Sequence, residues 1–174
     1  LKNETGIAMR TMGVAPARPV IRGLGGDRVF ISENGIKLND LSATSPDHAV
    51  GVEIFTIDKI QVLRGPRILT LTSTTFGGVV DVERNEIPEV LHNKIYGTLG
   101  MFAESANSGL LGAFTTEIPI NPFSLYFELS KRDANNVYTP HGYLQNSMSD
   151  NLNLAFGFSY IQNNLISGVS FRKY

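Results

Sequence analysis

The sequence predicts a small α+β domain with a mixed β-sheet, followed by antiparallel strands of the kind that cross a membrane as a β-barrel. The composition changes near the middle of the chain. Residues 1–90 carry 21 charged side chains and three aromatic ones, whereas residues 91–174 carry 10 charged and 13 aromatic side chains. This change predicts a water-facing domain over residues 1–88 and strands with an apolar outer face over residues 89–174.

Four short strands are predicted in the first half, each bounded by Gly, Pro, Asn or Asp. The pair Asn34-Gly35 follows the second of them and is the strongest short signal for a hairpin. The predicted sheet is small and mixed. Its strands are Val20–Arg22, Val29–Glu33, Ile60–Leu63 and Val79–Glu83.

Longer runs in the second half alternate with a period of two. Large apolar residues occupy one face of Phe123–Lys131 and of Leu152–Tyr160, and mostly small or polar residues occupy the other. An apolar outer face over about 9–11 residues is what a membrane-spanning barrel strand needs. Weaker strands are predicted at Ile95–Ala103, Leu110–Ile118 and Leu165–Arg172.

The connections in this half alternate in length. Asn121-Pro122 and Asn163-Asn164 form short turns, whereas Arg132–Asn151 contains a long polar loop. Short turns on one side and long loops on the other are typical of outer-membrane barrels. Five strands cannot close such a barrel, because the unpaired edges would lie in lipid. The membrane interpretation therefore predicts an incomplete barrel and a chain that is a fragment.

Composition and motifs exclude several other functions. A net charge of −1 gives no basic surface for nucleic acid, and no run of about 18 apolar residues predicts a transmembrane helix. No cysteine nucleophile, G-x-S-x-G, H-E-x-x-H or P-loop motif occurs. The glycines of Gly23–Gly26 do not complete a G-x-G-x-x-G motif, because Arg28 stands where the last glycine would be. The sequence therefore does not predict an enzyme.

Four blocks carry a resemblance to a known family. Their order and spacing resemble the plug domain of TonB-dependent outer-membrane receptors, and the resemblance covers about residues 1–88. The second half resembles the family only by pattern. The blocks are Pro19–Gly26, Arg28–Asp40, Ile60–Pro66 and Gly77–Val82.

The resemblance implies a location and a function. Members of this family lie in the lipid of the outer membrane of Gram-negative bacteria, where a plug fills a barrel of about 22 strands. They bind scarce extracellular ligands such as metal ions, metal complexes, siderophores, haem or cobalamin. The TonB–ExbB–ExbD complex supplies the energy that moves the plug. The implied chemistry is binding and gating, with zinc or an iron complex as possible cargo and no resident cofactor.

The resemblance also suggests roles for Arg22 and Arg64 in the plug. We expect both to form buried ion pairs with carboxylates of the barrel wall, because the planar guanidinium can bind a carboxylate with two hydrogen bonds. The alternative is that both side chains are solvated.

Asp47 and His48 are the candidate metal ligands. They lie in residues 43–50, a segment that resembles zinc-uptake receptors of the same family, and both residue types are suitable Zn²⁺ ligands. The alternative is a capping Asp beside a solvated His. His92 and His141 are expected to be solvated.

Two functions of different class therefore stay open. The chain is either part of a transport receptor or a soluble or surface-anchored β-rich binding module such as an adhesin. The two differ in the environment of one row of side chains, which would face lipid in a receptor and form a dry core in a module. The row is Phe123, Leu125, Phe127 and Leu129.

Overall fold

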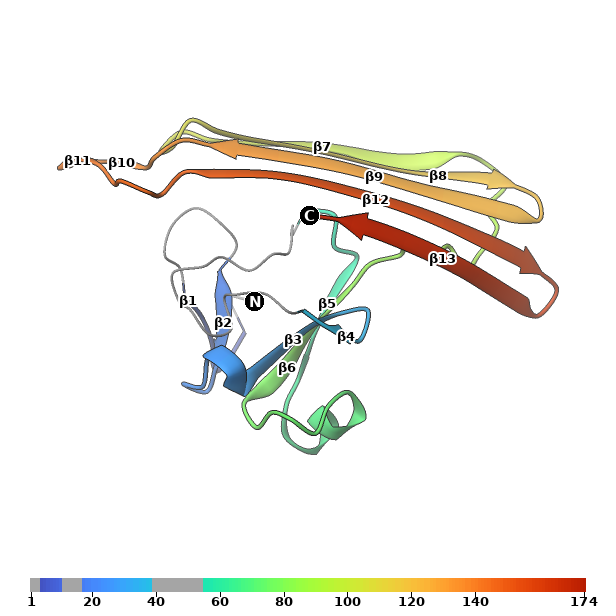
Figure 1. Ribbon diagram of the computed structural model, residues 1–174, viewed down its shortest axis with the longest axis horizontal. Helices are drawn as coiled ribbons and strands as arrows, with labels where there is room; N and C mark the ends of the chain where they lie inside the picture. Colours follow the sequence, from blue (N-terminus) through green and yellow to red (C-terminus); the bar gives the residue numbers. More distant parts are fainter. Residues whose placement is uncertain (1–3, 11–16, 39–54) are drawn as a thin grey trace. The chain divides into compact units, whose positions relative to one another are not determined.

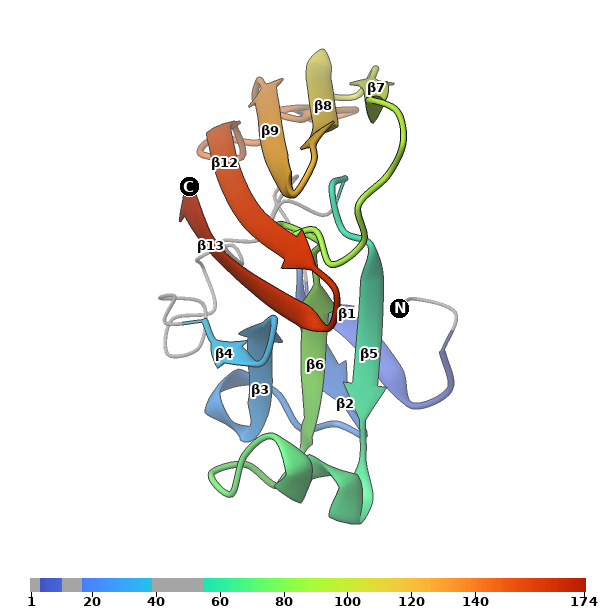
Figure 2. The ribbon, with the colours of Figure 1, turned by 90° about the vertical axis from the view of Figure 1, so that its right-hand side faces the viewer.

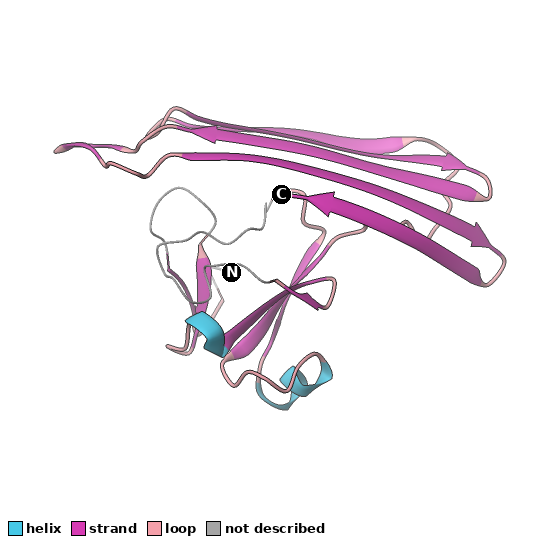
Figure 3. Ribbon diagram, in the orientation of Figure 1, coloured by secondary structure: helices cyan, strands magenta, loops and turns pink. Residues whose placement is uncertain are grey.

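The computed structural model describes residues 4–10, 17–38 and 55–174. The chain divides into two compact units, Leu1–Arg84 and Asn85–Tyr174. Strands dominate the described residues (Figure 3), and the two helical segments are short 3-10 helices, η1 at Gly26–Arg28 and η3 at Gly65–Thr70. No helix in the described ranges is long and apolar enough to cross a membrane.

The first unit is built around a mixed four-stranded sheet in the order β4-β3-β6-β5. Strands β3 and β6 are parallel, whereas β3–β4 and β5–β6 are antiparallel. Figure 2 shows β3, β6 and β5 side by side. The predicted small mixed sheet is therefore confirmed, but the strand predicted at Val20–Arg22 lies outside it and pairs as β2 in a separate two-stranded sheet. Its strands are β3 at Val29–Glu33, β4 at Ile36–Lys37, β5 at Lys59–Leu63 and β6 at Gly78–Glu83.

The hairpin predicted at Asn34-Gly35 joins β3 to β4. Both residues have positive φ values, 49° and 76°, as a two-residue hairpin turn with matching twist requires. The buried carboxylate of Asp81 on β6 accepts hydrogen bonds from the Gly35 N–H at 3.0 Å and from the Ser32 hydroxyl at 2.5 Å. The turn is thus tied to the centre of the sheet.

The apolar core of this unit is small. One cluster combines Ile21, Val29 and Val80 with the partly buried Val62. A second combines Ile31 and Val82 with partly buried neighbours. Among the described residues of this unit few large apolar side chains are buried, so hydrogen bonds such as those of Asp81 contribute to the specificity of this sheet.

A strand that the sequence did not predict pairs at the start of the unit. Strand β1 at Ile7–Arg10 runs antiparallel to β2 at Arg18–Ile21. Only Ile7 is buried in β1. Four residues with one buried side chain give too little periodicity for a prediction.

The second unit is a five-stranded antiparallel sheet in the order β13-β12-β9-β8-β7. Figure 1 shows the long strands side by side as one layer, with the small hairpin β10–β11 projecting beyond one end. All five predicted strands are present. They are β7 at Tyr96–Glu104, β8 at Gly109–Ile120, β9 at Phe123–Ala134, β12 at Ser149–Gln162 and β13 at Leu165–Lys173; the hairpin comprises β10 at Tyr138–Thr139 and β11 at Gly142–Tyr143.

In this sheet the apolar face is exposed and the polar face is buried, the opposite of the arrangement in a soluble protein. On β9 the side chains of Phe123, Phe127 and Leu129 are 38–39% exposed, whereas Ser124 and Glu128 between them are fully buried. Strand β12 alternates in the same way, with Phe156 directly opposite Phe127. An apolar exposed face and a polar buried face are the pattern of a barrel wall in lipid. In the row that distinguishes the two open functions, Phe123, Phe127 and Leu129 are therefore exposed and Leu125 is half-buried, an arrangement that favours a receptor.

Candidate functional site

The polar face of the sheet brings together hydrophilic side chains from several strands. Alternation places every second residue of a strand on this face, so the serines and carboxylates of neighbouring strands meet. Ser124 donates its hydroxyl hydrogen bond to Glu117 at 3.1 Å, and Asn153 donates to the hydroxyl of Ser130 at 3.1 Å. The most buried members of this face are Glu117, Ser124, Glu128, Ser130, Asn153 and Ser159.

An ion-pair cluster, which we call the linker clamp, comprises Glu86, Glu128 and Arg172. Nη1 and Nη2 of Arg172 donate to the two carboxylate oxygens of Glu128 at 2.8 and 2.7 Å, and Nε donates to Oε1 of Glu86 at 2.5 Å. The side chains of Arg172, Glu86 and Glu128 are 8%, 7% and 0% exposed. The hydroxyl of Tyr126 also donates to Glu128, at 2.9 Å. We call the five-stranded sheet the wall and residues 85–95, which precede β7, the linker. The guanidinium of Arg172 therefore joins Glu128 of the wall to Glu86 of the linker.

Two glycines let that segment lie directly on the strands. A Cβ atom at Gly157 on β12 would overlap the carbonyl oxygen of Glu86, and one at Gly168 on β13 would overlap the side chain of Ile87. We call Gly157 and Gly168 the glycine groove. Glycine is required here because only its backbone can be approached so closely. The groove and the clamp together fix residues 86–87 on the wall.

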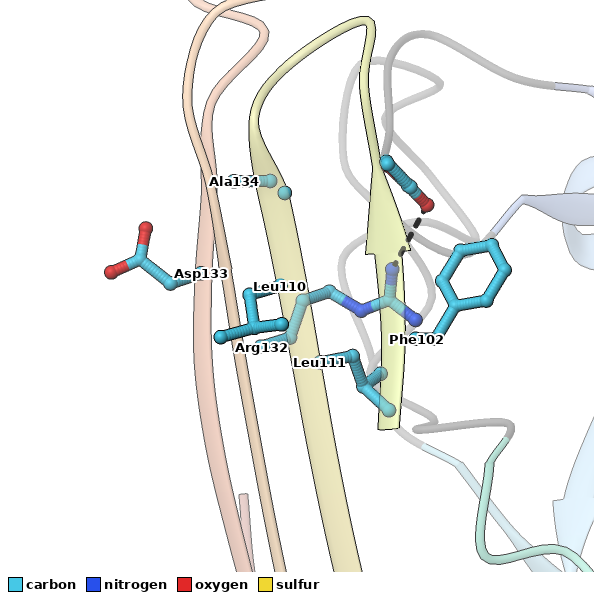
Figure 4. A pocket seen from close by; sticks show the side chains of 8 residues that line it. Phe102, Leu110, Leu111, Arg132, Asp133 and Ala134 are labelled. Carbon is cyan, nitrogen blue, oxygen red and sulfur yellow. Dashed lines mark ion pairs between the residues drawn. The ribbon is translucent and has the colours of Figure 1, made fainter. Parts of the chain in front are cut away.

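A second ion pair lies at the end of the sheet near the long loop. Arg132 of β9 pairs with Glu104 at the end of β7, with 3.7 Å between Nη1 and Oε1. Figure 4 shows the guanidinium near Phe102 and Leu111, while Asp133 points to the opposite side of the strand. Glu104 also accepts a hydrogen bond of 2.6 Å from Nδ2 of Asn107. The ion pair therefore anchors the β7–β8 turn.

The two arginines predicted as site residues lie outside these clusters. Arg22 is exposed in the turn after β2 and has a positive φ of 50°. Arg64, between β5 and η3, has a buried Nε atom without a hydrogen-bond partner. Neither guanidinium forms an ion pair with another described residue, so their pairing with wall carboxylates stays a prediction.

The candidate metal ligands Asp47 and His48 lie outside the described residues. His92 packs edge-on against Tyr96, with ring centroids 5.0 Å apart, and His141 is exposed. Within residues 4–10, 17–38 and 55–174, no group of three or more His, Cys, Asp or Glu could hold a metal ion.

The sequence did not single out the linker clamp. Glu128 is the one carboxylate on the polar face of the Phe123–Lys131 run, and this is a weak signal for a buried partner. Arg172 and Glu86 are 86 residues apart in the chain. A pairing over that separation depends on the register of β9, β12 and β13, which the pattern of single strands does not give.

Comparison with known proteins agrees with this architecture. Residues 1–79 match the family model described as TonB-dependent Receptor Plug Domain. The structure is similar to that of the copper transporter OprC, with a TM-score of 0.75 and 19% identity over 98% of this chain and 27% of that chain. It is also similar to the siderophore receptor PirA from Acinetobacter baumannii, with a TM-score of 0.70 and 16% identity over 95% of this chain and 27% of that chain.

A third similar structure is the pyoverdine outer membrane receptor FpvA from Pseudomonas aeruginosa. Its TM-score is 0.69, at 15% identity over 96% of this chain and 23% of that chain. The chain thus spans about a quarter of the length of these receptors. The plug match, the mixed sheet and the antiparallel sheet with a buried polar face are parts of one architecture. Residues 1–79 therefore match the plug domain of TonB-dependent receptors, and the chain has the architecture of these receptors of the Gram-negative outer membrane, with plug-domain residues followed by strands of an unclosed barrel wall.

Proposed function

We propose that the whole protein imports a scarce metal ion or metal complex across the outer membrane. The observation that carries this proposal is the plug-domain match of residues 1–79 ahead of a wall whose apolar face is exposed. The names of the similar structures, a copper transporter, a siderophore receptor and a pyoverdine receptor, support a metal-containing cargo. The work of such a site is binding and gating and includes no bond-making step.

In this mechanism the TonB–ExbB–ExbD complex moves the plug while the wall stays in place. The linker clamp supports the idea that the chain stays fixed at Glu86 while the plug moves, because Arg172 and the glycine groove hold Glu86 on the strands. Rearrangement would then be confined to residues before Asn85.

Arg22 and Arg64 are proposed to pair with carboxylates of the wall. The buried, unpartnered Nε of Arg64 supports this role, because a buried polar group without a partner costs about 1–3 kcal/mol. Uptake would require such pairs to exchange as the plug moves.

Uptake by the full-length receptor tests the function. In a host that lacks its own receptor, we expect accumulation of radioactive zinc or of an iron–siderophore complex only when the receptor and TonB are both present. A variant carrying Arg22→Gln and Arg64→Gln should accumulate several-fold less cargo at an equal receptor level. Accumulation that is equal with and without TonB would exclude energy-driven import.

The role of Asp47 and His48 is tested at limiting zinc. We expect the double variant Asp47→Ala plus His48→Ala to take up zinc at least tenfold more slowly than the parent, because a carboxylate and an imidazole would both be lost from the metal. His141→Ala, which removes an exposed histidine, is the matched control. Uptake that is unchanged in the double variant would remove the metal role of this pair.

A further inference from the structure

We propose that the wall binds a monovalent alkali cation between Glu117, Ser124 and Ser159, which we call the Glu117 cluster. The three residues belong to β8, β9 and β12, which are neighbours in the sheet. They lie near the end of the wall that carries the β8–β9 and β12–β13 turns. The three residues are 2%, 0% and 0% exposed, so their oxygen atoms are removed from bulk water.

Glu117 is a buried carboxylate without a basic partner. The hydroxyl of Ser124 donates a hydrogen bond to its Oε1 atom at 3.1 Å. In the part of the chain that the structure describes, no Lys, Arg or His side chain forms an ion pair with Glu117. Its neighbours in register, Tyr96 and Tyr126, are tyrosines and supply no cation. Because a buried carboxylate is costly unless a cation compensates its charge, the position favours a bound cation.

Ser159 adds an oxygen atom that needs a partner. Its Oγ is buried and has no hydrogen-bond partner. Ser159 lies directly opposite Ser124 on β9, and its neighbour on β13 is Gly168, which has no side chain to offer. Directly opposite residues have Cβ atoms about 4.5–5.5 Å apart, so one small ligand can contact both hydroxyls. A buried hydroxyl without a partner is rare and indicates that something else binds it.

The donor atoms determine the class of ligand. All of them are oxygens, which suit hard cations, whereas zinc and copper favour nitrogen and sulfur ligands. The hydroxyl of Ser124 directs its proton to Glu117 and keeps its lone pairs free for a cation. A single carboxylate neutralises a single positive charge, so a divalent ion would leave excess charge buried. The cluster therefore matches sodium or potassium.

The surrounding structure holds the three oxygens in place. The Ile161 N–H donates to the carbonyl of Pro122 at 2.8 Å, which joins the ends of β12 and β9 next to the cluster. The linker lies close by, since a Cβ atom at Gly168 would be 3.3 Å from Cβ of Ser159 and 2.4 Å from Cγ2 of Ile87. A bound cation would thus hold three strands together beside the place where the linker contacts the wall.

The test compares the full-length receptor in lipid vesicles in sodium, potassium and choline chloride at equal ionic strength. We expect the urea midpoint to rise with the concentration of sodium or potassium, because a ligand that binds only the folded state stabilises it. Choline should have no such effect, since it is too large to fit between two opposite serines and acts only by screening. The difference between sodium and potassium identifies the preferred ion.

Two variants assign the effect to the cluster. Glu117→Gln removes the charge and Ser159→Ala removes the unpartnered hydroxyl. Sodium NMR relaxation in detergent should show about tenfold weaker binding or less in each, since even residues behind the ligands of a metal usually change its affinity by about 10–100-fold. Ser130→Ala is the matched control, because Ser130 is a buried serine of the same face that already bonds to Asn153 at 3.1 Å. It should bind sodium like the parent.

Equal urea midpoints in the three salts would overturn the proposal, as would sodium binding by Glu117→Gln and Ser159→Ala equal to that of the parent. The variant carrying Arg22→Gln and Arg64→Gln should respond to alkali ions as the parent does. A response that first appears in this variant would show that a plug arginine neutralises Glu117, which would also overturn the cation site. Cargo uptake is measured separately, so failure of the cation site is distinct from failure of the proposed transport function.

Discussion

Replacing Arg172 with methionine is expected to lower the free energy of unfolding of the full-length receptor by about 3–5 kcal/mol. The substitution removes the cation that two buried carboxylates, Glu86 and Glu128, share. Methionine keeps much of the side-chain volume, so the loss reports charge and hydrogen bonding more than packing. The measurement is a urea titration of the receptor refolded into lipid vesicles.

A rescue variant separates the clamp from a general defect at this position. Arg172→Met combined with Glu86→Gln and Glu128→Gln removes all three charges and should recover most of the lost stability. Lys131→Met is the matched control, because its ion pair with Asp150 is 49% and 67% exposed and should contribute only about 0–1 kcal/mol. An Arg172→Met receptor as stable as the Lys131→Met receptor would show that the clamp does not hold the linker.

Valine at Gly157 is expected to displace the linker from the wall. A Cβ at this position would overlap the carbonyl oxygen of Glu86, which is backbone and cannot turn aside as a flexible side chain can. Overpacking of this kind typically costs about 1–3 kcal/mol, and here it should also separate Glu86 from Arg172. We expect a lower urea midpoint and faster protease cleavage between Arg84 and Val90.

Gly112 on strand β8 of the same sheet provides the control for this substitution. A Cβ there meets nothing within 4 Å, so Gly112→Val should change the stability by no more than about 0.5 kcal/mol and leave the linker protected. Equal cleavage of the two variants would contradict the close approach of Glu86 to β12.

The parts of the fold that follow local rules could be predicted from the sequence. Asn34-Gly35 has the backbone preference that its turn requires, and the alternation of Phe123–Lys131 corresponds directly to the two faces of β9. Strand β1 could not be predicted, because its four residues are specified by pairing with β2. The sequence pattern is therefore enough to predict a turn or a strand when residues close together in the chain determine its structure.

The linker clamp required tertiary information. Glu86 lies in an irregular segment with no periodic pattern, and Arg172 occurs near the end of a strand, where an exposed arginine would be equally ordinary. Only the alignment of β9, β12 and β13 brings Arg172 to Glu128, and the same guanidinium binds Glu86. Gly157 and Gly168 gave a hint, since glycine in a strand often marks a close backbone approach.

The position of Arg172 also sets an order of events during biogenesis. Arg172, the partner of Glu86, belongs to the last strand of this sheet. Four earlier strands must therefore be synthesised and aligned before Arg172 can bind Glu86. Until β13 docks, the carboxylate of Glu86 lacks the cation that holds residues 86–87 on the strands. Fixation of residues 86–87 on the strands is therefore a late step that depends on correct strand register.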